Sequence, residues 1–293
     1  MWRVEYCVPT VIIVLLASGS SLAGQPKPED STKTNLTAEV IVERALERMA
    51  AQEDSGIELE FSSVGRSRND SIDGDGRVTK TETAGYLRYP IEGYLYDEVT
   101  EKDGLPLDES GLREELKRKE KFAREARAHA ARGEEFIFNE MAIAFDRELM
   151  VRYNTRLSGN EVVRGYSCWV IDFEPKDGRL PDNRRMDKAL NRSTGTLWIS
   201  KKDFGVVRVA FEMQEPFRYL WGLAASLRHA EGRLDFKKIS PGFWAPSEFN
   251  LRLDLRVFFK GIRRHIQQTW NDYELLPVSA NPKSTHSDAK TNQ

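Results

Sequence analysis

Hydrophobic and polar residues alternate through most of the second half of the chain. The alternating segments are 166–175, 195–213, 231–261 and 263–276, and their apolar positions include Trp169, Ile171, Phe173, Val207, Val209, Phe211, Met213, Phe249, Leu251, Leu253, Leu255 and Val257. A period of two predicts strands with one wet face and one apolar face, typical of an antiparallel sheet that is covered on one side. Turn residues at Asp203–Gly205 and Pro241–Gly242 predict two hairpins.

The first half mixes two periods. Thr37 precedes an apolar pattern of helical spacing and predicts a helix over 38–52. Residues 56–61 then alternate apolar and charged side chains, which predicts a half-buried strand. The segments 77–90 and 92–104 are rich in threonine and tyrosine and predict further strands.

A helical insertion is predicted between the strands, over residues 108–149. Charged residues surround a narrow apolar stripe over 112–132, so that this helix presents a solvated face. Over 134–149, the residues Phe138, Met141, Phe145 and Leu149 fall on one helical face. Such a stripe packs as plain core or lines a cavity.

The segment Ser71–Glu82 ("SIDGDGRVTKTE") resembles an EF-hand loop in which a serine replaces the first aspartate ligand. An EF-hand requires a helix on each side, whereas the flanking residues here alternate like strands. Two Asp-Gly pairs between strands are a hairpin signal, because these residues accept the positive φ of a tight turn. We therefore predict a hairpin turn.

The ends of the chain differ from its middle. Residues 1–23 combine a short n-region, an apolar run and small residues before Ala23, which predicts a secretory signal peptide cleaved after Ala23; a retained anchor is the alternative. Residues 24–36 form a polar linker, and 277–293 form a disordered tail. Between them, 37–276 is predicted to be a single domain, in a periplasmic or secreted protein.

Composition and candidate chemistry change this picture little. The chain has 293 residues with a net charge of -2, so bulk charge does not indicate nucleic-acid binding. Cys168 is the single cysteine after the signal and lies in an apolar run, which predicts a buried structural thiol. No two histidines have metal-ligand spacing, and no glycine-rich loop opens a helix after a strand. We expect no catalytic residue, metal or cofactor.

The order of these elements, with "GTLWISKKDFGVVRVAFEM" at 195–213 and "GFWAPSEFNLRL" at 242–253, resembles the outer-membrane lipoprotein-sorting (LolA- and LolB-like) proteins, in an uncharacterised branch of that family. The resemblance covers roughly 37–276. It implies an α+β, mainly antiparallel β fold: a curved, half-open barrel with helices packed on its concave face. It also implies a carrier without enzymatic activity.

The function expected from these features is the binding of lipid or lipoprotein acyl chains in a mostly apolar pocket of roughly several hundred Å³. Its candidate lining is Phe138, Met141, Phe145, Trp169, Ile171, Phe173, Val207, Phe211, Leu251 and Leu253. The alternative is a sensor or scaffold that binds a segment of another envelope protein on the same sheet. The apolar segment 217–227 is either a buried strand or short helix, or an element at the mouth of the cavity.

Overall fold

The computed structural model describes residues 36–132, 145–182, 187–219, 225–258 and 260–277. The predicted signal peptide, nearly all of the linker and tail, and the candidate residues Phe138 and Met141 lie outside these ranges.

The described residues form helices and twelve strands. The helices are α1 (Ala38–Ser55), α2 (Glu109–Arg132), α3 (Arg147–Met150) and α4 (Asp187–Leu190), with a short 3-10 helix, η1 (Ile57–Glu60). The strands are β1 (Phe61–Ile72), β2 (Val78–Ile91), β3 (Tyr94–Lys102), β4 (Leu105–Pro106), β5 (Tyr153–Val163), β6 (Tyr166–Pro175), β7 (Ser193–Ser200), β8 (Val206–Met213), β9 (Phe217–Tyr219), β10 (Ala225–Ser240), β11 (Phe243–Val257) and β12 (Lys260–Leu275).

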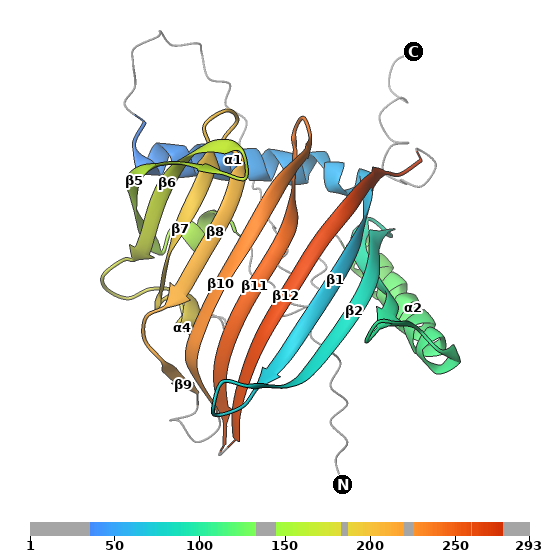
Figure 1. Ribbon diagram of the computed structural model, residues 1–293. Coiled ribbons are helices and arrows are strands. Elements are labelled where there is room, and N and C mark those ends of the chain that lie inside the picture. The colour runs from blue at the N-terminus through green and yellow to red at the C-terminus, as the bar shows by residue number, and fades with distance from the viewer. Residues whose placement is uncertain (1–35, 133–144, 183–186, 220–224, 259, 278–293) are drawn as a thin grey trace, which may run out of the picture.

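All strands belong to one antiparallel sheet, in the order β4-β3-β2-β1-β12-β11-β10-β8-β7-β6-β5, with β9 beside β10. Neighbours along the chain are mostly neighbours in the sheet, but β1 pairs with β12, so the first and last strands meet in the middle (Figure 1). The two edges, β4 and β5, do not pair with each other. The sheet is therefore open, which confirms the predicted fold class.

The sheet has an apolar face, here called the inner face, which α1 crosses at one end of the strands (Figure 1). Helix α1 buries Ile41, Val42, Ala45 and Leu46 against it. The opposite face is called the outer face. The helix α1 begins at Thr37, whose hydroxyl accepts a hydrogen bond from the Val40 amide, and ends at Gly56 with a left-handed φ of 64°.

Helix α2 does not share the face that α1 covers. It packs through Phe122 and Ala126 against Tyr96 of β3. Asp97 lies on the inner face, because its ion-pair partner Arg88 lies over Trp270 in the main core. Side chains alternate along a strand, so the neighbouring Tyr96 lies on the outer face. The expectation that the helices pack on the concave face is thus right for α1 and wrong for α2.

Two further local expectations need correction. Residues 57–60 form η1 rather than a strand, because Gly56 reverses the chain and the Leu59 amide bonds back to its carbonyl; the strand begins at Phe61. The amphipathic helix expected over 134–149 lies largely outside the described residues, and Phe145 is not helical. Asp146 caps a new helix, α3, by accepting a hydrogen bond of 2.6 Å from the Leu149 amide.

The predicted hairpin within Ser71–Glu82 is present, since β1 ends at Ile72 and β2 begins at Val78. The Asp73 carboxylate accepts hydrogen bonds of 2.9 Å from the amides of Asp75 and Arg77, and Gly76 has a φ of 84°. Strands flank the turn on both sides, so the resemblance to a calcium loop does not extend to its fold.

The β7–β8 hairpin is tied to the start of β11 by a carboxylate. Asp203 accepts hydrogen bonds from the Lys238 ammonium at 2.6 Å and from the Trp244 indole at 3.3 Å. Burial acts to raise the pKa of Asp203, but hydrogen bonds, foremost that from Lys238, outweigh it and lower the pKa to about 2. The ionised form is therefore the one that the fold stabilises.

Replacing Asp203 with asparagine is expected to lower the free energy of unfolding by about 1–2 kcal/mol at neutral pH. A carboxyl whose pKa is lowered on folding stabilises above its unfolded pKa, near 4, and this contribution is lost as pH falls to about 2. Urea denaturation of both proteins should therefore show a difference at pH 7 that shrinks towards pH 2. A difference that is the same at both pH values would contradict this.

Candidate ligand-binding site

The inner face is apolar across β6 to β11. Its central cross-strand row runs through directly paired residues, namely Ile171, Leu197, Val209, Leu234 and Phe249. Because residues two apart share a face, the alternation seen in the sequence builds one apolar surface from five strands. At the α1 end this surface is sealed, and Ile171 and Leu197 are fully buried.

From α1 towards the opposite end of the strands, the same face surrounds a cavity of about 140 Å³. Strand residues form its wall, and Met49 of α1, Phe145, α3 and α4 supply its remaining sides. The lining residues are Met49, Phe145, Leu149, Met150, Tyr153, Phe173, Ala189, Leu190, Ser193, Val206, Val209, Phe211, Leu227, Ala230, Leu234, Phe236, Phe249, Leu251 and Leu253. The hydroxyls of Ser193 and Tyr153 donate to the carbonyls of Ala189 and Leu190, so neither is left unpaired. The cavity is smaller than the several hundred Å³ expected from the sequence.

Five of the ten candidate residues line this cavity, namely Phe145, Phe173, Phe211, Leu251 and Leu253. Ile171 and Val207 belong to the same core but are fully buried outside the cavity lining. Trp169 stacks on Phe204, with ring centroids 5.1 Å apart, and does not line the cavity.

The sequence did not reveal the part of the lining that comes from connecting segments. Ala189 and Leu190 belong to α4, a single helical turn whose sequence carries no periodic signal. A buried ion pair holds this turn in place, because Arg152 lies 2.8 Å from Asp187 and both side chains are 1% exposed. Ala230 could have been predicted as a lining residue from the sequence, because it directly precedes a clear alternation of apolar and polar residues in β10.

The inner face changes character between β11 and β12. Phe249 of β11 is paired with Gln268 of β12, which is paired in turn with Ser67 of β1. In the neighbouring cross-strand row, Leu251 of β11 is paired with Ile266 of β12, and Ile266 is paired with Asn69 of β1. Gln268 and Asn69 are 1% and 7% exposed, so the polar part of the face is buried as well.

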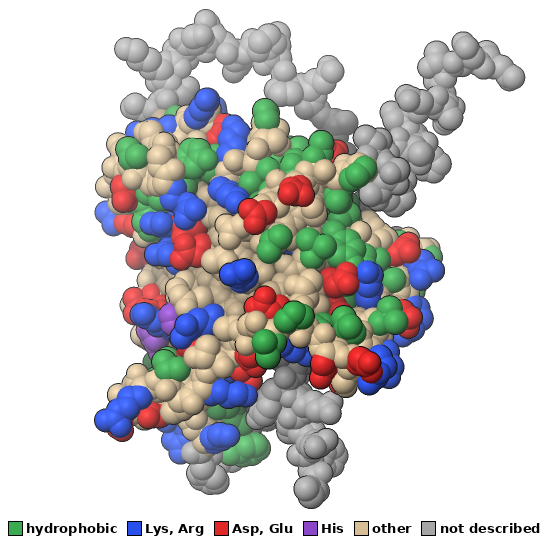
Figure 2. Space-filling model, turned by 45° about the vertical axis from the view of Figure 1, so that its right-hand side comes forward, with side chains coloured by type: hydrophobic (Ala, Val, Ile, Leu, Met, Phe, Trp, Pro, Cys, Tyr) green, Lys and Arg blue, Asp and Glu red, His purple; other side chains and the backbone are tan. Residues whose placement is uncertain are grey.

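The outer face is polar, and its charges are mostly paired. A shallow groove of about 810 Å³ over β5 to β11 contains Arg156, Arg233 and Arg252, which lie within 2.9 Å of the carboxylates of Asp172, Glu248 and Glu231. Figure 2 shows acidic and basic side chains interspersed on the visible surface, with neither sign forming a continuous area. Such a surface is typical of a solvated sheet face.

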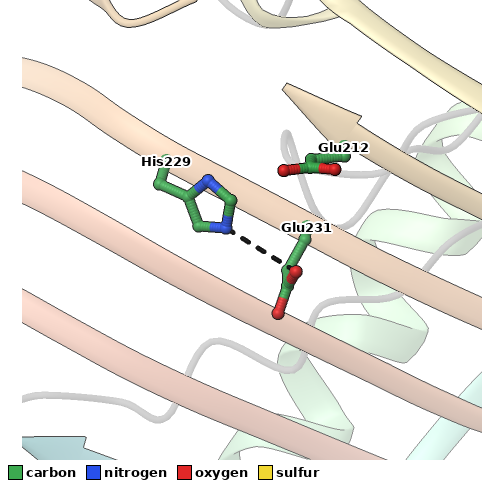
Figure 3. Close-up of side chains that lie close together, drawn as sticks. All are labelled: Glu212, His229 and Glu231. Atoms are coloured by element: carbon green, nitrogen blue, oxygen red, sulfur yellow. Dashed lines mark ion pairs between the residues drawn. The ribbon is translucent and has the colours of Figure 1, made fainter. Parts of the chain in front are cut away.

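One cluster on the outer face consists of residue types that commonly bind metal ions. Glu212 of β8 and His229 and Glu231 of β10 bring their ligand atoms within 4.8 Å of one another (Figure 3). The sequence did not show it, because Glu212 comes from a neighbouring strand. However, Glu231 also accepts a hydrogen bond of 2.8 Å from Arg252, and the side chains of His229 and Glu231 are 41% and 37% exposed. We therefore assign no metal here.

Proteins similar to this chain are found by structure and not by sequence. No family model matches the sequence, and no curated protein matches it. A DUF1329-family protein from Desulfovibrio piger has 13% identity and a TM-score of 0.29, over 81% of this chain and 92% of its own. A LolA-superfamily protein from Nitrosomonas europaea has 13% identity and a TM-score of 0.29, over 83% and 95%.

Two further solved structures belong to the same group of matches. A putative outer membrane lipoprotein-sorting domain from Vibrio parahaemolyticus has 12% identity and a TM-score of 0.30, over 81% of this chain and 96% of its own. MucB of Pseudomonas aeruginosa, in complex with MucA, has 9% identity and a TM-score of 0.26, over 80% and 95%. The structural neighbours are LolA-superfamily and DUF1329 proteins.

Proposed function

We propose that this protein is a non-enzymatic binding protein that holds an acyl chain in the cavity of its inner face. The observation that carries the proposal is the chemistry of the cavity wall. Its side chains are almost all hydrocarbon, and the hydroxyls of Ser193 and Tyr153 are already bonded to backbone carbonyls. An apolar cavity of this kind excludes water and favours an apolar occupant.

The size of the cavity sets the strength expected of this binding. An apolar cavity of about 150 Å³ accepts benzene, so one of about 140 Å³ holds roughly six carbon atoms. At about 0.8 kcal/mol per methylene, six carbons contribute about 5 kcal/mol, or a dissociation constant of a few tenths of a millimolar. Micromolar binding requires about ten methylenes. A longer chain would therefore continue past Leu227 and Leu255, which extend the apolar face towards the end opposite α1.

The proposed location is the periplasm or the exterior of the cell. It rests on the signal-like residues 1–23, which lie outside the described part of the chain. None of the helices in the described ranges is both long enough and apolar enough to cross a membrane.

The size of the cavity also favours a second candidate, an apolar side chain from another protein. A leucine or phenylalanine inserted between Phe211 and Leu253 would fill about 140 Å³ without a lipid. MucB, one of the structural neighbours, was solved in complex with MucA. In this alternative the inner face binds a protein segment.

The proposal is tested with an acyl-chain fluorophore on the delipidated full chain. Phe211→Glu places a charge in the cavity, and we expect it to weaken binding by at least about tenfold. Ala210→Glu is the matched control, because Ala210 is the adjacent residue, lies on the outer face and is paired with Arg233. It should bind as the wild type does.

A second variant separates loss of the site from loss of the fold. Ala230→Leu fills part of the cavity with hydrocarbon, so it should weaken binding while keeping or raising the melting temperature. Failure of the wild-type chain to bind any acyl probe, with the fold intact, would overturn the acyl-chain proposal and leave the protein segment as the candidate.

A further inference from the structure

The polar half of the inner face contains buried polar atoms that make no hydrogen bond within the described part of the chain. Asn69 Oδ1, Gln268 Oε1 and Trp270 Nε1 are buried, and none has a hydrogen-bond partner among the described residues. The three residues are 7%, 1% and 3% exposed. Buried polar atoms are nearly always paired, so these three, with the hydroxyls of Tyr86 and Ser63 on the same face, require an explanation.

The three side chains lie together on two neighbouring strands. Gln268 and Trp270 are two residues apart on β12 and therefore share the inner face. Asn69 of β1 is paired with Ile266, which places it diagonally beside Gln268, a separation of about 7 Å in an antiparallel sheet. Together they form a polar strip defined by Asn69, Gln268 and Trp270.

The Trp270 ring of the strip packs against a paired arginine. The Arg88 guanidinium lies 5.4 Å from the centre of the Trp270 ring and is itself held by Asp97 through hydrogen bonds of 2.7 and 2.8 Å. Because Arg88 is neutralised by Asp97, the indole has an N–H donor without a free positive charge beside it.

The strip adjoins the wall of the apolar cavity directly. Phe249 and Leu251, which line the cavity, are paired with Gln268 and Ile266 of the next strand. A molecule whose hydrocarbon end occupies the cavity therefore has its other end within reach of β12 and β1. The inner face changes from apolar to polar over a single strand-to-strand step.

We propose that the ligand is an amphiphile with an uncharged head that both donates and accepts hydrogen bonds, such as an acylated polyol or a fatty amide. Its tail lies in the cavity, and its head lies against Asn69, Gln268 and Trp270. This inference rests on the proposed acyl-chain function and specifies the class of acyl compound.

The chemistry of the polar strip disfavours two other kinds of ligand head group. A pure hydrocarbon or a methyl ester offers no donor to the amide oxygens of Asn69 and Gln268, which keeps the cost of burying them. A free carboxylate meets amide oxygens that repel it, and Arg88 is already paired. Arg264, the next inner-face cation, donates to the Ser71 hydroxyl, two residues beyond Asn69. An anionic head held by Arg264 is thus a distinct outcome of the test.

The test compares three probes that share one tail: 1-dodecanoylglycerol, methyl dodecanoate and dodecanoate. Each is titrated into the delipidated full chain by calorimetry. We expect the glycerol ester to bind about tenfold more tightly than the methyl ester, as two or three added hydrogen bonds would give. Gln268→Leu should reduce that preference to about twofold, whereas Gln267→Leu, the adjacent outer-face glutamine, should leave it unchanged.

Stability provides an independent readout. Gln268 leaves a buried oxygen unpaired in the free protein, so Gln268→Leu should keep or raise the melting temperature while it lowers the preference for the glycerol ester. A structural role for this amide would instead lower the melting temperature. A clear decrease, with the preference unchanged, overturns the inference.

The remaining outcomes separate the two proposals. Equal binding of all three probes overturns the polar-head inference and leaves the acyl-chain function intact. Tighter binding of dodecanoate that is lost in Arg264→Gln also overturns it, in favour of an anionic head. If none of the probes binds to the folded chain, the acyl-chain function and the inference both fail.

Discussion

Replacing Arg152 with leucine should lower the free energy of unfolding by about 3–5 kcal/mol, because it leaves the Asp187 carboxylate buried without its ion-pair partner. Arg152 also donates hydrogen bonds of 3.1 Å to the Pro181 carbonyl and to Asn191 Oδ1, so the whole segment before β7 loses an anchor. Because α4 lines the cavity, acyl-probe binding should weaken in the same variant.

The double variant Arg152→Leu/Asp187→Leu separates the charge from the packing. A buried pair replaced on both sides by apolar residues costs little, so the double variant should be more stable than Arg152→Leu alone. Urea denaturation of wild type, both single variants and the double variant measures the coupling. Additive losses in the double variant would show that the ion pair itself is unimportant.

Gly195→Ala is expected to lower the free energy of unfolding by about 3 kcal/mol, through overpacking. A β-carbon at this position would lie 2.1 Å from the Ala210 carbonyl oxygen and 2.4 Å from the Phe173 ring. The backbone cannot yield as a flexible side chain would. Phe173 lines the cavity, so its displacement should also alter acyl-probe binding.

Gly159→Ala is the matched control for this change. Gly159 lies on edge strand β5, and a β-carbon there would have no atom within 4 Å. The free energy of unfolding of Gly159→Ala should stay within about 0.5 kcal/mol of that of the wild type in thermal or urea denaturation. Equal effects at Gly159 and Gly195 would contradict the argument from close approach.

The strands that carry strict alternation could be predicted from the sequence. Ile171, Phe211 and Leu251 are each followed by a charged residue, and the structure places all three on the inner face. The edge strand β5 could not be predicted in this way. It has few neighbours to bury its side chains, so its sequence, YNTRLSGNEVV, is polar and irregular.

The site was predictable only in part. Phe173 and Phe211 follow from alternation, but the contributions of α3 and α4 depend on where loops return to the sheet. The polar strip was not predicted, because a glutamine or asparagine in an alternating strand is ordinarily assigned to the solvent face. Its burial depends on β12 pairing with β1, a contact between opposite ends of the chain that a local pattern does not contain.

The pairing of β1 with β12 also determines the order in which this molecule can fold. A chain that emerges from its N-terminus can form β1 to β4 early and β5 to β11 later, but no strand pairing joins these two parts of the sheet until β12 is present. Forming so distant a contact is slow, because the entropy cost of ordering the intervening chain comes before the stabilisation from the contact. Until then β1 and β11 each present an unpaired edge, and β11 carries the apolar residues Phe249 and Leu251 beside it. A chain interrupted before β12 would therefore expose the unpaired backbone groups of two edge strands and would be prone to aggregate.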